Sequence, residues 1–225
     1  YILDYAGLRR SRGLKYNGLS SSEFFGALLA ALIHDFKHPG LNTTHVKKAR
    51  HPLNLQYLDD SPLERMHVAE AYMMCADSSN NVNIFSNMTT SDYMNVRHAV
   101  VTLVLATDLA HHFGFVEKLK LTTTDHSTGF RGSSGSTNER QKYVDMQLSL
   151  GAQNVDNMTV MKIAIKLSDI GHCAKELSLH LKWSELVNEE FYMQGDIERS
   201  NTKDFPNGPE PLWDRNQSNL MPKNQ

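Results

Sequence analysis

Apolar residues recur at helical spacing along most of the chain, and no segment shows a strand-turn-strand pattern. Residues 20–23 (Ser-Ser-Ser-Glu) have the form of a capping box and predict an apolar helix that reaches about Asp35. Pro39-Gly40 then stops this helix. Residues 61–64 (Ser-Pro-Leu-Glu) place proline at a first helical position and predict a second helix to about Ala76. The predicted fold class is therefore all-α, as one compact multi-helix domain.

The same pattern predicts four further helices. They run over about Thr43–Arg50, from Ser91 or Asp92 to about Phe113, over Asn157 to about Ile170, and from Ser178 to about Gln194 with Gly195 as the stop. We expect Val160, Ile163, Ala164 and Leu167 to share one face. Residues 121–139 are rich in threonine, serine and glycine, so we expect a flexible insertion there.

Composition narrows the class of protein. The 225 residues suffice for one large domain or two small ones, and the net charge of −2 without a basic run argues against a nucleic-acid partner. Cys75 and Cys173 suggest free thiols in a reducing compartment. The longest apolar stretch, residues 24–33, is too short to cross a bilayer, so we expect a cytoplasmic domain without direct membrane contact. The first residue is not methionine, so we expect an upstream segment.

His34 and Asp35 are adjacent at the end of the first predicted apolar helix. Neighbouring helical side chains lie about 100° apart, so both can reach one metal cluster. His38 would lie on the same side as His34 if the helix persists that far. Imidazole with carboxylate suits Zn, Mn or Fe, and an additional carboxylate edge can share a harder ion such as Mg. An exposed His-Asp pair at a helix end is the alternative for this dipeptide.

A second carboxylate for such a cluster is Asp169, at the end of an apolar helix, although a water-exposed helix end would explain it equally well. Glu64 and His67 lie three residues apart on one helix face, where Glu64 can orient metal-bound water or instead cap the helix with Ser61. Asp108, together with two histidines, forms a polar cluster at the end of the helix predicted to reach Phe113.

Five segments, in order along the chain, resemble motifs of the class I cyclic nucleotide phosphodiesterases, a family within the HD superfamily. One such match would be weak evidence, whereas five in family order favour a metal site over the alternatives above. The segments are His34-Asp-Phe-Lys-His38-Pro-Gly40, Tyr57-Leu-Asp-Asp-Ser61-Pro-Leu-Glu64-Arg-Met-His67, Leu105-Ala-Thr-Asp108, Ser168-Asp169-Ile-Gly-His172, and Trp183 through Glu189-Glu-Phe-Tyr-Met-Gln-Gly-Asp196.

The resemblance implies a two-metal hydrolase. His34, Asp35 and Asp169 would ligate a tightly held zinc, and Asp35 would also reach a second ion, Mg or Mn. A hydroxide between the two ions would attack the cyclic phosphate in line. The further roles that the resemblance implies are a water network held by His38, Glu64 and His67, a place for Asp108 near the waters of the second metal, and substrate binding by His172 and Gln225.

Some positions depart from the family pattern. The family carries a Y-H-N-x-x-H-A motif upstream, whose first histidine is the general acid and whose second completes the zinc shell, and we expect it just before Tyr1. The phenylalanine that clamps the base would follow Gln225. Thr43 stands where the family usually has Asn or Gln, and Leu58 where it has Asn. Residues 1–225 would therefore be a partial catalytic domain.

The function that the resemblance implies is hydrolysis of cAMP, cGMP or both to the 5′-monophosphate in cyclic nucleotide signalling. Two alternatives stay open: another HD-type nucleotide phosphohydrolase, and a regulatory domain that binds nucleotide without turnover. The segment from Glu189 to Asp196 favours a cyclic nucleotide phosphodiesterase over a generic HD hydrolase, which shares only the metal residues. Thr43 and Leu58 depart from the family pattern, which is the reason to retain the regulatory domain as an alternative.

Overall fold

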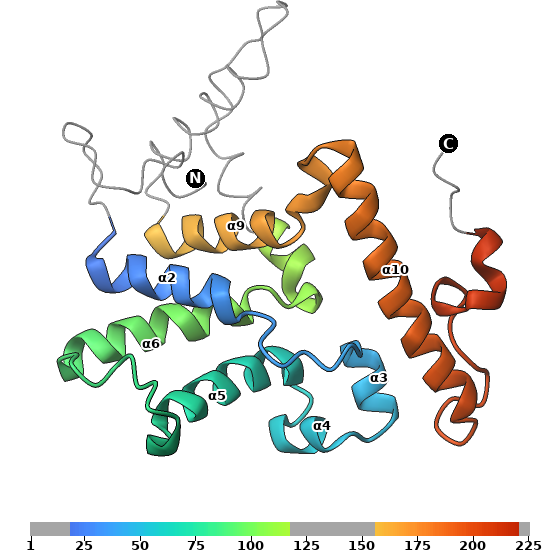
Figure 1. The fold of residues 1–225 in the computed structure, drawn as a ribbon, viewed down its shortest axis with the longest axis horizontal. Coiled ribbons are helices and arrows are strands. Elements are labelled where there is room, and N and C mark those ends of the chain that lie inside the picture. Colours follow the sequence, from blue (N-terminus) through green and yellow to red (C-terminus); the bar gives the residue numbers. More distant parts are fainter. Residues whose placement is uncertain (1–18, 118–155, 221–225) are drawn as a thin grey trace, which may run out of the picture. The chain divides into compact units, whose positions relative to one another are not determined.

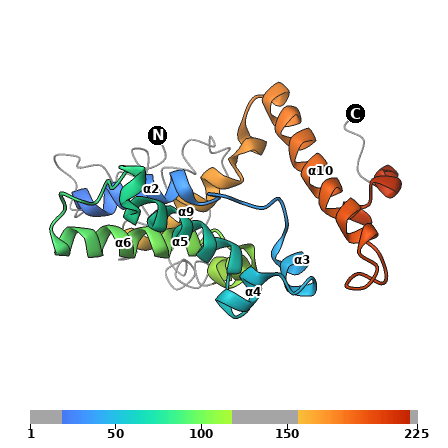
Figure 2. The same ribbon diagram turned by 60° about the horizontal axis from the view of Figure 1, so that its bottom comes forward.

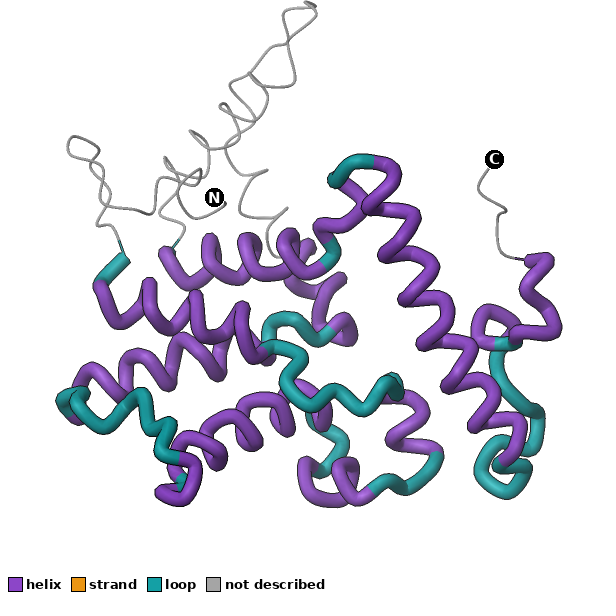
Figure 3. Tube along the Cα trace, in the orientation of Figure 1, coloured by secondary structure: helices purple, strands orange, loops and turns teal. Residues whose placement is uncertain are grey.

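The computed structural model describes residues 19–117 and 156–220, and within these ranges the chain forms helices and loops without a strand (Figure 3). The all-α fold class is confirmed. The described contacts divide the chain into two units: unit 1 is Tyr1–Leu32 with Ile84–Ser168, and unit 2 is Ile33–Asn83 with Asp169–Gln225. The predicted insertion at 121–139 and residue Gln225 lie outside the described residues.

Three helices run beside one another in unit 1: α2 (Ser21–Ile33), α6 (Thr90–Leu105) and α9 (Asn157–Asp169) (Figures 1 and 2). The predicted capping box starts α2, since the amide of Glu23 donates to Ser20 Oγ over 3.2 Å and the amide of Ser20 donates to Glu23 Oε2 over 2.8 Å. The helix ends at Ile33, two residues before the predicted end.

The core of unit 1 depends on a close approach of α2 to α6. A Cβ on Gly26 would lie 2.7 Å from Ala99 Cβ, so glycine is needed for this spacing. Ser22 Oγ also donates to Asp92 across the two helices over 3.0 Å. The buried apolar side chains include Ala27, Ala30, Val96, Val100, Leu103, Val104, Met161, Ala164 and Ile165.

The helix predicted to reach Phe113 ends at Leu105, so that expectation was wrong. A short 3₁₀ helix, η2 (Leu109–His111), and a helix over 112–117 follow the break. Thr107 Oγ1 donates to the carbonyl of Val104 over 2.8 Å, and Asp108 accepts the amide of Ala110 over 2.8 Å. These side chains replace the helical partners of the backbone, which ends the helix.

The start and end of α9 match the prediction to within one residue, but its buried face differs. Met161, Ala164 and Ile165 are buried, whereas Leu167 is exposed. No single described helix is long and apolar enough to cross a bilayer, and Thr90–Leu105 with Leu109–Glu117 meets that test only as a pair bent by 78°. The apolar residues of α6 are largely buried within the protein.

Unit 2 contains the helices α3 (Thr43–Lys48), α4 (Pro52–Tyr57), α5 (Pro62–Ala76) and α10 (Leu177–Ser200), with the 3₁₀ helices η1 (Ser78–Asn80), η4 (Gly171–Ala174), η5 (Pro211–Trp213) and η6 (Arg215–Leu220). The predictions of α3 and α5 are confirmed, and α4 was not predicted. Helix α4 packs on α5, while η4, η5 and η6 contact α10.

Helix α10 continues through Gly195 to Ser200, although the sequence analysis placed its end at that glycine. A Cβ at residue 195 would lie 1.9 Å from the carbonyl oxygen of Trp213. The glycine therefore allows η5 to approach the helix, and it does not terminate the helix.

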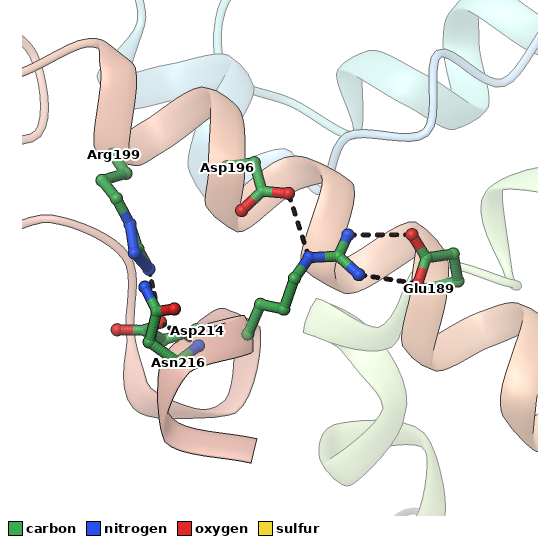
Figure 4. A network of polar contacts seen from close by, with 6 residues as sticks. Glu189, Asp196, Arg199, Asp214 and Asn216 are labelled. Atoms are coloured by element: carbon green, nitrogen blue, oxygen red, sulfur yellow. Dashed lines mark hydrogen bonds and ion pairs between the residues drawn. The ribbon is translucent and has the colours of Figure 1, made fainter.

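Polar contacts tie the segment after α10 back to that helix (Figure 4). The guanidinium of Arg215 donates to both carboxylate oxygens of Glu189, over 2.8 and 2.9 Å, and to Asp196 over 3.2 Å. Glu189 in turn raises the pKa of Arg215. Nearby, Arg199 pairs with Asp214. These exposed bonds stabilise modestly one by one, and together they fix the path of the segment.

Substituting Gly195→Ala should destabilise the protein, because the added methyl group overlaps a backbone oxygen that a side-chain rotation cannot move. We expect a loss of about 1–3 kcal/mol in the free energy of unfolding, measured by urea denaturation. The matched control is Gly114→Ala, where a Cβ meets no described atom within 4 Å. Equal midpoints for the two variants would contradict the packing described for η5 and α10.

Candidate metal centre

His34 and Asp35 lie in a turn that begins directly after α2. The amide of Phe36 donates to the carbonyl of Ile33 over 2.9 Å, and the amide of His38 donates to the carbonyl of Asp35 over 3.0 Å. Lys37 adopts a left-handed conformation with φ of 59°. The helical relation expected between His34 and His38 is therefore absent, and the turn positions His38 instead.

One group of possible metal ligands consists of His34, Asp35 and Asp169. His34 Nε2 lies 3.3 Å from Asp35 Oδ2 and 3.3 Å from Asp169 Oδ1. Asp169 is the last residue of α9, so residues 134 positions apart in the chain supply the two carboxylates. The structure thus brings together the three residues that the sequence analysis assigned to zinc.

A second group consists of Asp35, His38 and His67. His67 Nε2 lies 3.9 Å from Asp35 Oδ1, and the His38 and His67 rings lie 5.5 Å apart. The side chain of His67 is only 2% exposed, whereas that of Asp35 is 64% exposed. Asp35 belongs to both groups, and it is accessible to a ligand from solvent.

The charges around Asp35 favour its ionised form. A hydrogen bond with His34, together with the nearby His34, His38 and His67, lowers the pKa of Asp35 despite partial burial. Burial lowers the pKa of His67, so its neutral form is favoured. Its Nδ1 lies 2.7 Å from the carbonyl oxygen of Phe36. That oxygen can only accept, so Nδ1 carries the proton and Nε2 keeps its lone pair.

His38 has the opposite ring assignment. The amide of Gly40 donates to His38 Nδ1 over 3.1 Å, so this nitrogen accepts and a neutral His38 carries its proton on Nε2. Glu190 Oε1 lies 4.0 Å from the same nitrogen. A nitrogen that carries a proton donates to water or phosphate oxygen and does not ligate a metal.

Glu64 lies in the first turn of α5, three residues before His67. The alternative that Glu64 and Ser61 form a capping box is wrong, because Ser61 has a left-handed φ of 44° and makes no side-chain capping bond. Residues 61–64 resemble the capping box at residues 20–23 in sequence, but the left-handed backbone at Ser61 does not form the box.

His172 lies in η4, and its Nδ1 is 3.0 Å from Nδ1 of His180 in α10, with the rings stacked. One ring must donate to the other. Asp108 belongs to unit 1, where its carboxylate caps η2 and lies 3.9 Å from His111 Nε2. Gln225 is outside the described residues.

The sequence analysis did not single out three residues of α10 that contact the segment after the turn. They are Glu190, Gln194 and Glu198, which face His38, Asn42 and His45 respectively. Glu190 and Gln194 lie four residues apart within the predicted helix, which was a usable signal, whereas Glu198 lies beyond the end that the sequence analysis placed at Gly195.

Imidazole nitrogens and carboxylate oxygens in two overlapping groups form a donor set that suits a pair of divalent metal ions. A carboxylate shared between two such groups is a common feature of two-metal hydrolytic sites.

The chain belongs to the 3′5′-cyclic nucleotide phosphodiesterase family, whose model matches residues 6–225. Among curated relatives it is 31% identical over 203 residues to the probable 3′,5′-cyclic phosphodiesterase pde-6 of Caenorhabditis elegans, covering 90% of this chain and 23% of the relative. One human relative is the high affinity cGMP-specific 3′,5′-cyclic phosphodiesterase 9A, which is 31% identical over 80% of this chain and 26% of its own length. Another is the high affinity cAMP-specific and IBMX-insensitive 3′,5′-cyclic phosphodiesterase 8A, which is 30% identical over 88% of this chain and 23% of its own length. The chain therefore spans about a quarter of the length of these relatives.

The lowered pKa of His67 predicts a pH-dependent stability. Between the folded-state pKa and the ordinary value of 6.5, the unfolded chain binds more protons, so stability should fall as pH is lowered below about 6.5. Urea denaturation in a chelator at pH values from 7.5 to 5 measures this slope. His67→Gln should flatten the slope, since the other histidines titrate in both proteins. An unchanged slope would show that His67 is not held neutral by burial.

Proposed function

We propose that this protein hydrolyses 3′,5′-cyclic nucleotides to 5′-nucleoside monophosphates with the help of two divalent metal ions. The observation that carries the proposal is the shared Asp35 carboxylate, which lies between two groups of ligand-type side chains in a chain of this family. In this proposal, residues 1–225 belong to a phosphodiesterase catalytic domain.

His34, Asp35 and Asp169 would hold a zinc ion, and Asp35 would also contact a second ion, Mg or Mn. The donor set supports this division, because one imidazole with two carboxylates suits zinc, and the exposed edge of Asp35 suits a harder ion with several waters. A metal pair of this kind polarises the phosphate and lowers the pKa of bound water near neutrality.

The chain's own residues would orient the water around the metals. His38, with its proton on Nε2, would donate to a water or phosphate oxygen, and neutral His67 would accept through Nε2. Glu64, one turn before His67, would accept a hydrogen bond from the same waters. Asp108 is proposed for the waters of the second ion. Residues of this kind around a metal site are worth about 10- to 100-fold in affinity or activity.

For the substrate, we propose a cyclic purine nucleotide held in part by His172 and Gln225. The names of the two human relatives specify cGMP in one case and cAMP in the other, so both bases belong to the proposal. If His172 Nδ1 accepts from His180, its Nε2 carries the proton and can donate to a base; if Nδ1 donates, a neutral His172 accepts through Nε2.

Substituting Asp169→Ala in the full-length protein should reduce hydrolysis of cAMP or cGMP by at least about 100-fold, because a metal ligand is removed. Release of the 5′-monophosphate is measured with Mg or Mn present, and the zinc content of both proteins is determined. The matched control is Asp60→Asn, which removes an exposed carboxylate that pairs with Arg65 in the same unit.

Wild-type turnover with a normal control would support the proposal. A folded wild-type protein that binds metal and releases no 5′-monophosphate from either nucleotide would overturn it and favour a domain that binds nucleotide without turnover. Full activity in Asp169→Ala would show that the ligand assignment is wrong.

A further inference from the structure

Three polar side chains on α10 face the segment that follows the metal-site turn. Glu190, Gln194 and Glu198 are spaced by four residues, so they lie along one face of the helix. Their partners follow in order along the other segment: Glu190 Oε1 lies 4.0 Å from His38 Nδ1, Gln194 Oε1 accepts the amide of Asn42 over 2.8 Å, and Glu198 Oε1 lies 3.0 Å from His45 Nδ1. We call these three residues the polar ladder.

Two residues of the polar ladder, Gln194 and Glu198, and the partner His45 are almost fully buried. Gln194 is 3% exposed, Glu198 5% and His45 4%. Polar groups at such depth destabilise the fold unless their hydrogen bonds are made. Here they are made, since Gln194 Nε2 donates to Glu198 over 2.8 Å and His45 Nδ1 lies 3.0 Å from Glu198 Oε1, while the ring of Phe205 stacks on His45 at 4.8 Å.

The directions of these hydrogen bonds are fixed. The amide of Asn42 can only donate, so the nearby Gln194 atom is the oxygen and its nitrogen faces Glu198. Glu198 Oε1 then accepts from Gln194 and, when ionised, from His45. Asn42 Oδ1 accepts the amide of His45 over 2.8 Å and caps α3. Each donor meets an acceptor, and reversing the Gln194 amide would break both of its contacts.

The segment from His38 to Asn42 is therefore bonded to α10 at Asn42, and Glu190 of the same helix lies near its His38 end. A Cβ on Gly40, which has a φ of +70°, would lie 3.7 Å from Glu190 Cγ, so the helix also packs against the middle of the segment. His38 belongs to the second group with Asp35 and His67, where it would hold water around the metals. A shift of the segment along α10 would move the His38 ring away from that group.

We propose that Gln194 is a positioning residue for the metal centre, acting through Asn42 and the His38 segment. This inference rests on the proposed metal-dependent function. A residue with only a general structural role would affect folding stability without changing metal affinity in the folded protein, and this difference separates the two possibilities.

The test measures the affinity of the full chain for Mn²⁺ alone, by isothermal titration, beside the urea midpoint of each protein. In Gln194→Glu, two carboxylates face each other where a donor met an acceptor, and their repulsion displaces the oxygen that accepts the amide of Asn42. We expect Mn²⁺ affinity to fall by about 10- to 100-fold. The double exchange Gln194→Glu with Glu198→Gln restores one donor opposite one acceptor at every contact, so affinity should return to within about 3-fold of wild type.

The matched control is Arg215→Gln, which breaks the contacts that Arg215 makes with Glu189 and Asp196 on another face of α10. It should lower the urea midpoint and leave Mn²⁺ affinity unchanged. If Gln194→Glu does not fold, Gln194→Met serves instead, because the thioether fills the same space and removes the bond to Asn42 without repulsion.

Loss of affinity in the single variant with recovery in the double exchange supports the inference. Unchanged affinity in Gln194→Glu, or no recovery in the double exchange, overturns it while leaving the proposed function intact. A wild-type chain that binds no Mn²⁺ contradicts the proposed metal centre itself, and the inference falls with it.

Discussion

Asp35 Oδ2 lies 3.3 Å from His34 Nε2, and Asp35 Oδ1 lies 3.9 Å from His67 Nε2, so one carboxylate faces histidines from two segments. This arrangement requires α2 to end at Ile33, because a continued helix would carry Asp35 and His38 round its axis. It also requires the buried ring of His67 to reach the turn, which its bond to the Phe36 carbonyl secures. The end of α9 adds Asp169 to the same group.

Helix α10 binds two separate segments of the chain. Its polar ladder holds the segment that follows His38, and the ion pairs of Arg215 with Glu189 and Asp196 hold the segment after the helix. The run from Glu189 to Asp196 thus divides between two faces, and within it Gly195 permits the close approach of Trp213. Through Glu190 the run lies near His38, which gives it a physical reason to accompany an HD pair.

The sequence predicted most helix starts because caps and proline act locally, as at Ser20 and Pro62. Helix ends were harder, since the side chains of Thr107 and Asp108 stop α6, and a tertiary contact explains Gly195. His34, Asp35 and Asp169 were grouped through the family resemblance, and the structure brings them together. The left-handed Lys37 that positions His38, and the pairing of α10 with the segment from His38 to His45, depend on contacts that no local pattern encodes.

The central claim is that Asp35 is shared by two metal ions. Anomalous diffraction from crystals of the full-length protein grown with Zn²⁺ and Mn²⁺, collected at both absorption edges, tests it most directly. The account predicts two peaks that share the Asp35 carboxylate, with zinc in contact with His34 and Asp169 at about 2.0–2.2 Å. A single ion bound away from Asp35, or two ions of which neither contacts that carboxylate, would contradict the account.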